Sequence, residues 1–292
     1  MAAQRHPGNG HRHIRTLHLK LPASLWAGLE ERQRLTGEPI AHIVRAALAD
    51  ALQVEHHTLY QVSTSTALVE GIYRGAVTVG QLLEHGDFGL GTFDGLDGEM
   101  VICDGRVLQV RADGSVREAA AGDSSPFALV TRFEPEQTFT VAACDDLAQL
   151  QAAIDPLRAS ANVFYAIRVD GAFAAVHTRA MCRTDEGVPL VEAAAHQPEF
   201  HLREVRGTMV GFWAPPYARA LEVPGYHLHF VTAARDAGGH VLDCSGRDLR
   251  VQIQEVRDLR VALPANEEFL RADLTRDPAA DLARAESKPD RR

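Results

Sequence analysis

The sequence predicts an α+β fold in which most of the sheet is antiparallel. Two stretches of alternating apolar and polar residues, 162–171 and 171–182, indicate strands with one buried face. Short helical stretches at 81–86 and 145–158 lie between strand-like segments. Turn signals recur as DGLDGE, CDGR, RADGS, VDG and DAGG, and tight turns of this kind join antiparallel neighbours.

Composition limits the class of protein. The chain has 292 residues, which suggests one large domain or two to three smaller ones, and its 46% hydrophobic and 24% charged residues are typical of a globular protein. It has no apolar run near the ~20 residues that span a membrane, and no apolar block at the start that would indicate a secretory signal. Its four cysteines are far apart in sequence and form no CxxC pair. We therefore expect unpaired thiols and a cytoplasmic protein without membrane contact.

The net charge of −9 is unevenly distributed. Residues 1–55 hold seven Lys or Arg and five Asp or Glu, so this segment carries +2 and the remainder carries −11. An acidic main body argues against nucleic-acid binding there, because contacts to phosphates need cations. The basic N-terminal segment leaves such binding open.

A small strand–helix–helix domain is expected near the N-terminus. Residues 1–12 are typical of a disordered lead, and alternation then predicts a strand over 14–21 with Thr16, His18 and Lys20 on its polar face.

Two helices are expected to follow this strand. The first is predicted over Ala23–Leu35 and closed by Gly37. The second begins near Pro39, a favourable first-turn residue, and carries one continuous apolar stripe. Strand and helices together define a domain over residues 13–53.

This order resembles the ribbon-helix-helix family of DNA-binding proteins, in the stretch RTLHLKLPASLWAGLEERQRLTGEPIAHIVRAAL. The resemblance implies that two chains pair their strands into a ribbon in the DNA major groove, with Thr16, His18 and Lys20 facing the bases. Glu38 and Pro39 fit poorly at the start of the second helix, where a phosphate would bind, because one adds negative charge and the other lacks a donor. A helical dimerisation extension is the open alternative.

The segment GYHLHFVTAARDAGGHVLDC predicts a metal site in the main domain, which we place at residues 60–292 after a linker at 54–59. His227 and His229 are two residues apart, so they share one face of a strand. Turn residues before His240 allow a hairpin to return it beside the other two. Three imidazoles with an open fourth position are typical of catalytic zinc, and iron, nickel and copper also accept these ligands. Solvent-facing histidines that pair by chance are the alternative, since the chain has 14.

Other site classes fit less well. A cupin-type oxygenase normally adds a carboxylate to its HxH pair, and Asp236 in the turn is a weak substitute. GLGTFDGLDGE lacks the third glycine of a dinucleotide fingerprint. Residues 57–287 contain no lysine, which argues against a Schiff-base decarboxylase.

Residues 59–288 resemble the acetolactate decarboxylase family. The stretches that carry the resemblance include LYQVSTSTALVEGIYRG, HGDFGLGTFDGLDGEM, SPFALVTRFEP, NVFYAIRVDG, GTMVGFWAPPYARALEVPGYHLHF, GGHVLDC and LARAES. The implied fold has two packed β-rich subdomains, one a mixed sheet and one a barrel-like antiparallel sheet, usually in a homodimer.

The resemblance also implies the active-site residues. The zinc ligands would be His227, His229 and His240, with Arg179 contacting the substrate, Glu99 and Glu286 as active-site glutamates and Thr92 as an accessory residue. Composition alone predicts a solvated end from Arg276 onwards, whereas the resemblance places this tail over the active site.

The implied reaction is the decarboxylation of 2-acetolactate to acetoin. Zinc would stabilise the enediolate, the Arg179 fork would grip the substrate carboxylate, and a glutamate would protonate one face. Which of Glu99 and Glu286 is the acid stays open. The alternative function is a ribbon-helix-helix regulator whose decarboxylase-like domain senses acetolactate or a metal. The presence of both glutamates favours the enzyme.

Overall fold

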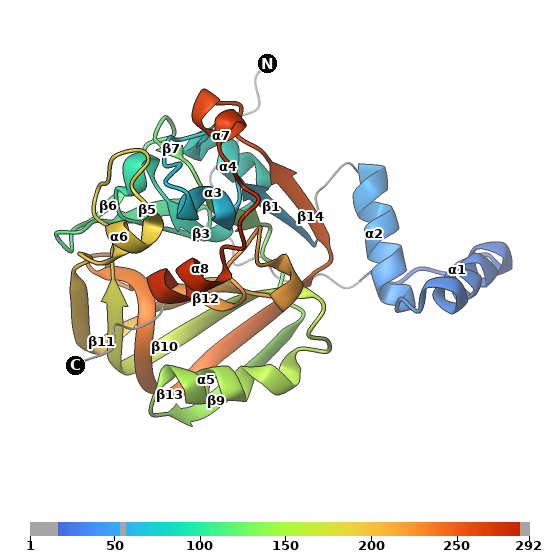
Figure 1. Cartoon of the computed structure of the whole chain (residues 1–292). Helices are drawn as coiled ribbons and strands as arrows, with labels where there is room; N and C mark the ends of the chain where they lie inside the picture. The colour runs from blue at the N-terminus through green and yellow to red at the C-terminus, as the bar shows by residue number, and fades with distance from the viewer. Residues whose placement is uncertain (1–16, 53–56, 287–292) are drawn as a thin grey trace, which may run out of the picture. The chain divides into compact units, whose positions relative to one another are not determined.

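The computed structural model describes residues 17–52 and 57–286 (Figure 1). The chain divides into two compact units, residues 1–56 and 57–292. Among the described residues, none of the helices is both long and apolar enough to cross a bilayer.

The N-terminal unit contains two helices, α1 (Ala23–Thr36) and α2 (Ile40–Leu52). The predicted closure of α1 is confirmed, because Gly37 has left-handed backbone with φ 75° and its N–H donates to the Gln33 carbonyl at 2.8 Å. The predicted apolar helix α2 is also present, and Ile43 on its stripe is buried.

The strand expected over residues 14–21 is not formed by the part that the structure describes. Residues 17–22 have no regular secondary structure, because no described segment of the chain is hydrogen-bonded to them as a neighbouring strand. Thr16 lies outside the described residues, and His18 and Lys20 are exposed. The ribbon-helix-helix architecture and its DNA contacts therefore stay predictions.

The second unit contains a seven-stranded mixed sheet in the order β14-β1-β8-β3-β4-β5-β6. β1 and β14 are parallel, and the other neighbours are antiparallel. Its strands are β1 (Thr58–Val62), β3 (Phe88–Thr92), β4 (Glu99–Cys103), β5 (Arg106–Val110), β6 (Val116–Glu118), β8 (Ala128–Thr131) and β14 (Asp258–Ala262). β2 (Val77–Thr78) and β7 (Ser124–Ser125) form a separate pair.

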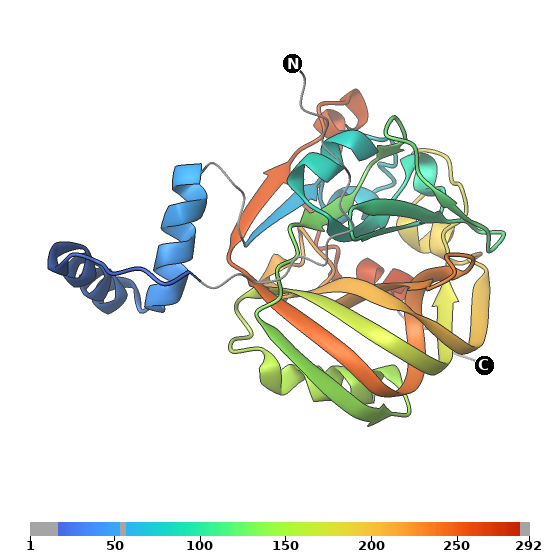
Figure 2. The ribbon, with the colours of Figure 1, turned by 180° about the vertical axis from the view of Figure 1, so that it is seen from behind.

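A five-stranded antiparallel sheet packs against the mixed sheet (Figures 1 and 2). Its order is β10-β11-β12-β13-β9, and β10 also pairs with β13. Its strands are β9 (Gln137–Cys144), β10 (Phe164–Arg179), β11 (Glu199–Ala214), β12 (Gly225–Thr232) and β13 (Gly238–Val256). The α+β class is confirmed, and the barrel-like description of this sheet stays a prediction.

The helices of this unit are short. They are α3 (Ser65–Val69), α4 (Val79–His85), α5 (Leu147–Ile154), α6 (Leu190–Ala194), α7 (Glu267–Arg271) and α8 (Ala279–Glu286), with 3₁₀ turns η1 (Asp94–Leu96), η2 (Asp155–Leu157) and η3 (Pro216–Ala218). The two helices predicted here correspond to α4 and α5, which begin at side-chain caps on Thr78 and Asp146. The CDGR turn is also confirmed, because Asp104 and Gly105 both have positive φ between β4 and β5.

The turn predicted at VDG is wrong. β10 runs without a break from Phe164 to Arg179, and Gly171 lies inside it at a shift of register with β13. The glycine instead allows Leu249 of β13 to pack closely against β10, since a Cβ at position 171 would lie 2.6 Å from Cδ2 of Leu249.

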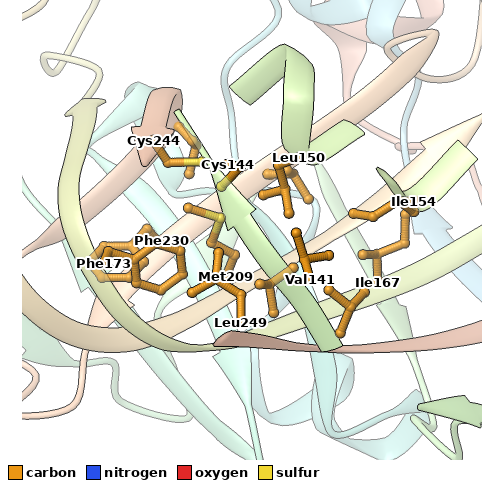
Figure 3. Packing of buried hydrophobic residues seen from close by; sticks show 14 of the residues in the cluster. Val141, Cys144, Leu150, Ile154, Ile167, Phe173, Met209, Phe230, Cys244 and Leu249 are labelled. Atoms are coloured by element: carbon orange, nitrogen blue, oxygen red, sulfur yellow. The ribbon is translucent and has the colours of Figure 1, made fainter. Parts of the chain in front are cut away.

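Apolar side chains fill the space between the two sheets and cover their outer faces. Phe88 and Leu129 of the mixed sheet pack with Phe212 of the antiparallel sheet in one buried cluster. A second cluster lies on the antiparallel sheet beneath α5, which contributes Leu150 and Ile154 (Figure 3).

Cys144 and Cys244 are neighbours in the cluster beneath α5, although they are far apart in sequence (Figure 3). Both are free thiols, as expected, and they interact through a side-chain hydrogen bond. Sequence separation concealed this proximity, because β9 and β13 are adjacent strands.

Candidate metal centre and active site

Three histidines on two adjacent strands form a buried cluster. His227 and His229 lie on β12 and share one face, and His229 is directly opposite His240 on β13. The three ring centroids are 5.1, 5.2 and 5.4 Å apart, and no more than 7% of each residue is exposed. Strand pairing therefore brings together the three imidazoles that the sequence singled out.

Gly239 makes this approach of the strands feasible. Its φ is 130°, and a Cβ at this position would lie 2.4 Å from the carbonyl oxygen of Arg179 on β10. Any side chain would push β13 away from β10 and would displace His240.

Hydrogen bonds orient two of the imidazoles. Nδ1 of His229 donates to the carbonyl oxygen of Met100 at 2.8 Å, because a carbonyl can only accept. Its Nε2 therefore carries a lone pair, and this buried atom has no hydrogen-bond partner. Nδ1 of His227 lies 3.3 Å from Oε1 of Glu222. Both contacts leave Nε2 for a metal, as is usual for metal-binding histidines.

The cluster fits a divalent transition metal. One ligand nitrogen from each histidine lies within 4.8 Å of the others, and three imidazoles are a ligand set that zinc accepts. Burial holds the pKa of His229 and His240 well below the usual range, so both are in the neutral form that binds metals. For His227, burial lowers the pKa, but the hydrogen bond to Glu222 and the nearby carboxylates together raise it.

Both predicted glutamates face this cluster. Oε1 of Glu99 accepts a hydrogen bond from the backbone N–H of Met181 at 3.0 Å, and its Oε2 lies 3.4 Å from Nε2 of His229. Burial raises the pKa of Glu99 to about 7, although the charge of Arg179 opposes this. Oε2 of Glu286 lies 3.2 Å from Nε2 of His240.

Arg179 stands at the end of β10 and points into the same region. Its Nη2 lies 3.4 Å from Oε2 of Glu286, and its buried Nε has no hydrogen-bond partner. A planar guanidinium with an unused donor is suited to a carboxylate ligand.

Thr92 supports the site indirectly. Its hydroxyl donates to the carbonyl oxygen of Gly98 at 2.8 Å, and Thr92 is directly opposite Glu99 in the β3–β4 pair. The hydroxyl thus holds the turn that leads into Glu99.

One cavity of about 50 Å³ is lined by all seven predicted site residues, His227, His229, His240, Glu99, Glu286, Arg179 and Thr92. Helix α8 covers part of it, because Leu282 and Ala285 are each only 2% exposed and pack with Met181 and Leu190. A solvated end therefore does not describe residues 279–286, and this packing places Glu286 in the cavity wall.

Glu222 was not predicted from the sequence. This carboxyl is 1% exposed, contacts His227 and has a pKa raised by burial. Its only sequence signal is its place in EVPGYHLH, shortly before the histidine pair. Asp236, weighed as a weak carboxylate ligand, instead accepts a hydrogen bond from the Thr232 hydroxyl at 2.7 Å within the turn.

Comparison with known proteins gives one consistent family. The alpha-acetolactate decarboxylase family model matches residues 59–276, which ends before Glu286. The chain is 42% identical over 247 residues to the alpha-acetolactate decarboxylase of Methylococcus capsulatus, covering 84% of this chain and 95% of that protein. It is 40% identical over 234 residues to that of Bacillus subtilis, covering 80% of this chain and 92% of that protein.

Solved structures agree. The crystal structure of alpha-acetolactate decarboxylase from Bacillus subtilis strain 168 superposes with a TM-score of 0.77 at 39% identity. The match covers 79% of this chain and all of that one.

The histidine cluster generates a binding prediction. We expect wild-type protein, dialysed free of exchangeable metal, to retain one zinc ion in the cavity, and His229→Ala to retain none, because two imidazoles alone hold zinc weakly. Metal analysis by mass spectrometry checks this. His196→Ala is the control, since His196 is exposed and belongs to none of the candidate metal-ligand groups of the described residues. Full zinc content in His229→Ala would exclude the site.

Proposed function

Since the chain belongs to the alpha-acetolactate decarboxylase family and is a carboxy-lyase, we propose that it converts 2-acetolactate to acetoin and CO2 with zinc held by His227, His229 and His240. The observation that carries this proposal is the cavity in which three buried imidazoles meet one arginine and two carboxyl groups. A bound zinc ion would supply the Lewis acid that accepts the negative charge left when CO2 departs.

Arg179 would bind and orient the substrate carboxylate. Its unpartnered Nε and its Nη2 offer two parallel donors, which match the two oxygens of a carboxylate. In the described structure Nη2 contacts Glu286, so the substrate carboxylate would replace Glu286 as the partner of this nitrogen. Holding the carboxylate fixes the direction in which CO2 leaves.

Glu99 or Glu286 would return a proton to the product. Oε1 of Glu99 is held by the Met181 N–H, which leaves Oε2 facing His229. Oε2 of Glu286 faces His240. Each carboxyl oxygen is therefore beside the proposed metal position, and protonation from one fixed side would give chiral acetoin.

Helix α8 would keep bulk water out. Leu282 and Ala285 give the cavity an apolar wall beside Glu286. Exclusion of water strengthens the electrostatic interactions of Arg179 and the carboxyl groups.

The regulator alternative is not favoured, because relatives that match about four-fifths of the chain are named as decarboxylases. For the N-terminal unit we propose self-association. Its described residues expose large apolar side chains, among them Leu25 (58%), Trp26 (48%), Leu48 (44%) and Leu52 (69%). So much exposed apolar surface on two helices favours a protein partner, and a second copy of this chain is the simplest one.

Arg179→Lys tests the substrate contact. Lysine keeps the charge but lacks the two-donor fork, and a charge-assisted hydrogen bond is worth about 1.5–3 kcal/mol, so we expect kcat/KM to fall about 10- to 100-fold. Zinc content and melting temperature should stay near wild type. Arg183→Lys, at an exposed side chain, is the matched control. Wild-type kcat/KM in Arg179→Lys would remove this residue from the site.

Glu286→Gln tests the role of the tail. Glutamine keeps the shape but cannot transfer a proton, so we expect acetoin formation to fall about 10²- to 10⁴-fold while zinc stays bound. Glu99→Gln, assayed alongside, shows which carboxyl sets the chirality of the product. Glu192→Gln, on the exposed side of α6, is the control. A Glu286→Gln enzyme that works at the full rate would show that α8 only covers the cavity.

Leu48→Glu/Leu52→Glu tests self-association of the N-terminal unit. Charges on this apolar surface should weaken self-association of the full chain at least tenfold, measured by analytical ultracentrifugation. Leu263→Glu, a 60% exposed leucine of the second unit, should leave it unchanged. Equal association of the wild type, the double variant and Leu263→Glu would contradict the proposal. Salt-sensitive DNA binding that only the double variant loses would instead support the ribbon-helix-helix prediction.

A further inference from the structure

A second group of metal-ligating side chains lies outside the cavity, on strands β10 and β11. His177 of β10 is directly opposite His201 of β11 in the strand register. Glu199 is two residues before His201, so both side chains stand on the same face of β11. None of the three lines the cavity that holds the first histidine cluster.

The three side chains converge. Nε2 of His177 donates to Oε2 of Glu199 at 2.7 Å. The rings of His177 and His201 are stacked, with centroids 4.1 Å apart and planes 20° apart. One ligand atom from each residue lies within 4.8 Å of the other two, the same closeness that the cavity histidines have.

From this geometry we propose that His177, Glu199 and His201 form a second site for a divalent transition metal, with zinc as the first choice. Two imidazoles and one carboxylate are a ligand set that zinc accepts, with water in the remaining position. Copper and nickel take the same ligands. Strand pairing and ring stacking hold His201 beside His177, so that one ligand atom of each residue lies close to the other two.

This site differs from the cavity in its access to solvent. His177 is buried, whereas Glu199 and His201 are exposed at the surface. Because one ligand is fixed in the sheet and two are exposed to water, we expect this site to exchange its metal freely. A metal here would join β10 to β11 near the strand end that carries Arg179, whose register partner is Glu199.

The experiment is a metal titration of the full chain. Protein is first loaded with zinc and dialysed, so that only the tightly held cavity metal remains, and is then titrated with Zn²⁺ by calorimetry. The chain has 14 histidines, so any weak binding elsewhere is common to all variants. The quantity of interest is therefore the difference between variants.

We expect His201→Ala to bind one equivalent less than wild type while its dialysis-resistant zinc is unchanged. Glu199→Gln, which keeps a hydrogen-bond acceptor for His177, should weaken binding of this equivalent at least tenfold. His196→Ala should titrate like wild type.

Identical titrations of wild type and His201→Ala would overturn the proposal and leave His177 and Glu199 as a structural pair. Because His229→Ala removes the cavity metal, the same titration on that background tests the second site independently of the proposed activity. Loss of the exchangeable equivalent in His229→Ala would also contradict a separate site.

Discussion

The pairing of β12 with β13 is the constraint on which the site depends. His229 and His240 are register partners, and the alternation of β12 places His227 on the same face. A shift of one residue in this register would turn the histidines to the opposite face, so the pairing must be held firmly. Gly239 allows it by letting β13 pass the backbone of Arg179. The same close contact of strands thus positions the proposed metal ligands and Arg179, the proposed substrate-binding residue.

Charge balance gives a second reason for a cation in the cavity. The carboxyl groups of Glu99, Glu222 and Glu286 lie around the histidines, and Arg179 is the cationic side chain that the described residues place among them. Burial raises the pKa of Glu99 and Glu222, because a buried carboxylate without a full counter-charge is costly. A divalent cation among these groups would stabilise their ionised forms, because its positive charge would add to that of Arg179.

Sequence patterns predicted those features of the fold that depend on residues close together in the chain. Two-residue spacing and a glycine-rich turn were enough to predict that His227, His229 and His240 lie close together. The same reasoning failed at VDG, because Gly171 serves a close contact with Leu249 inside β10 and no turn.

Contacts between distant segments left little trace in the sequence. Glu222 has no motif that marks it as a site residue, and only the fold buries it against His227. Cys144 and Cys244 become neighbours only because β9 pairs with β13. The tail looks solvated by composition, and only its packing against α3 and α6 reveals Leu282 as an anchor. The predicted N-terminal strand depends on a partner strand, which the alternation of one chain cannot supply.

We propose that the cavity histidines hold the metal on which decarboxylation depends. The most direct measurement is acetoin formation from 2-acetolactate by the full chain before chelation, after prolonged dialysis against a chelator, and after zinc is restored. We expect turnover to disappear with the cavity metal and to return when one equivalent of zinc is bound there. Undiminished turnover by metal-free protein would contradict it.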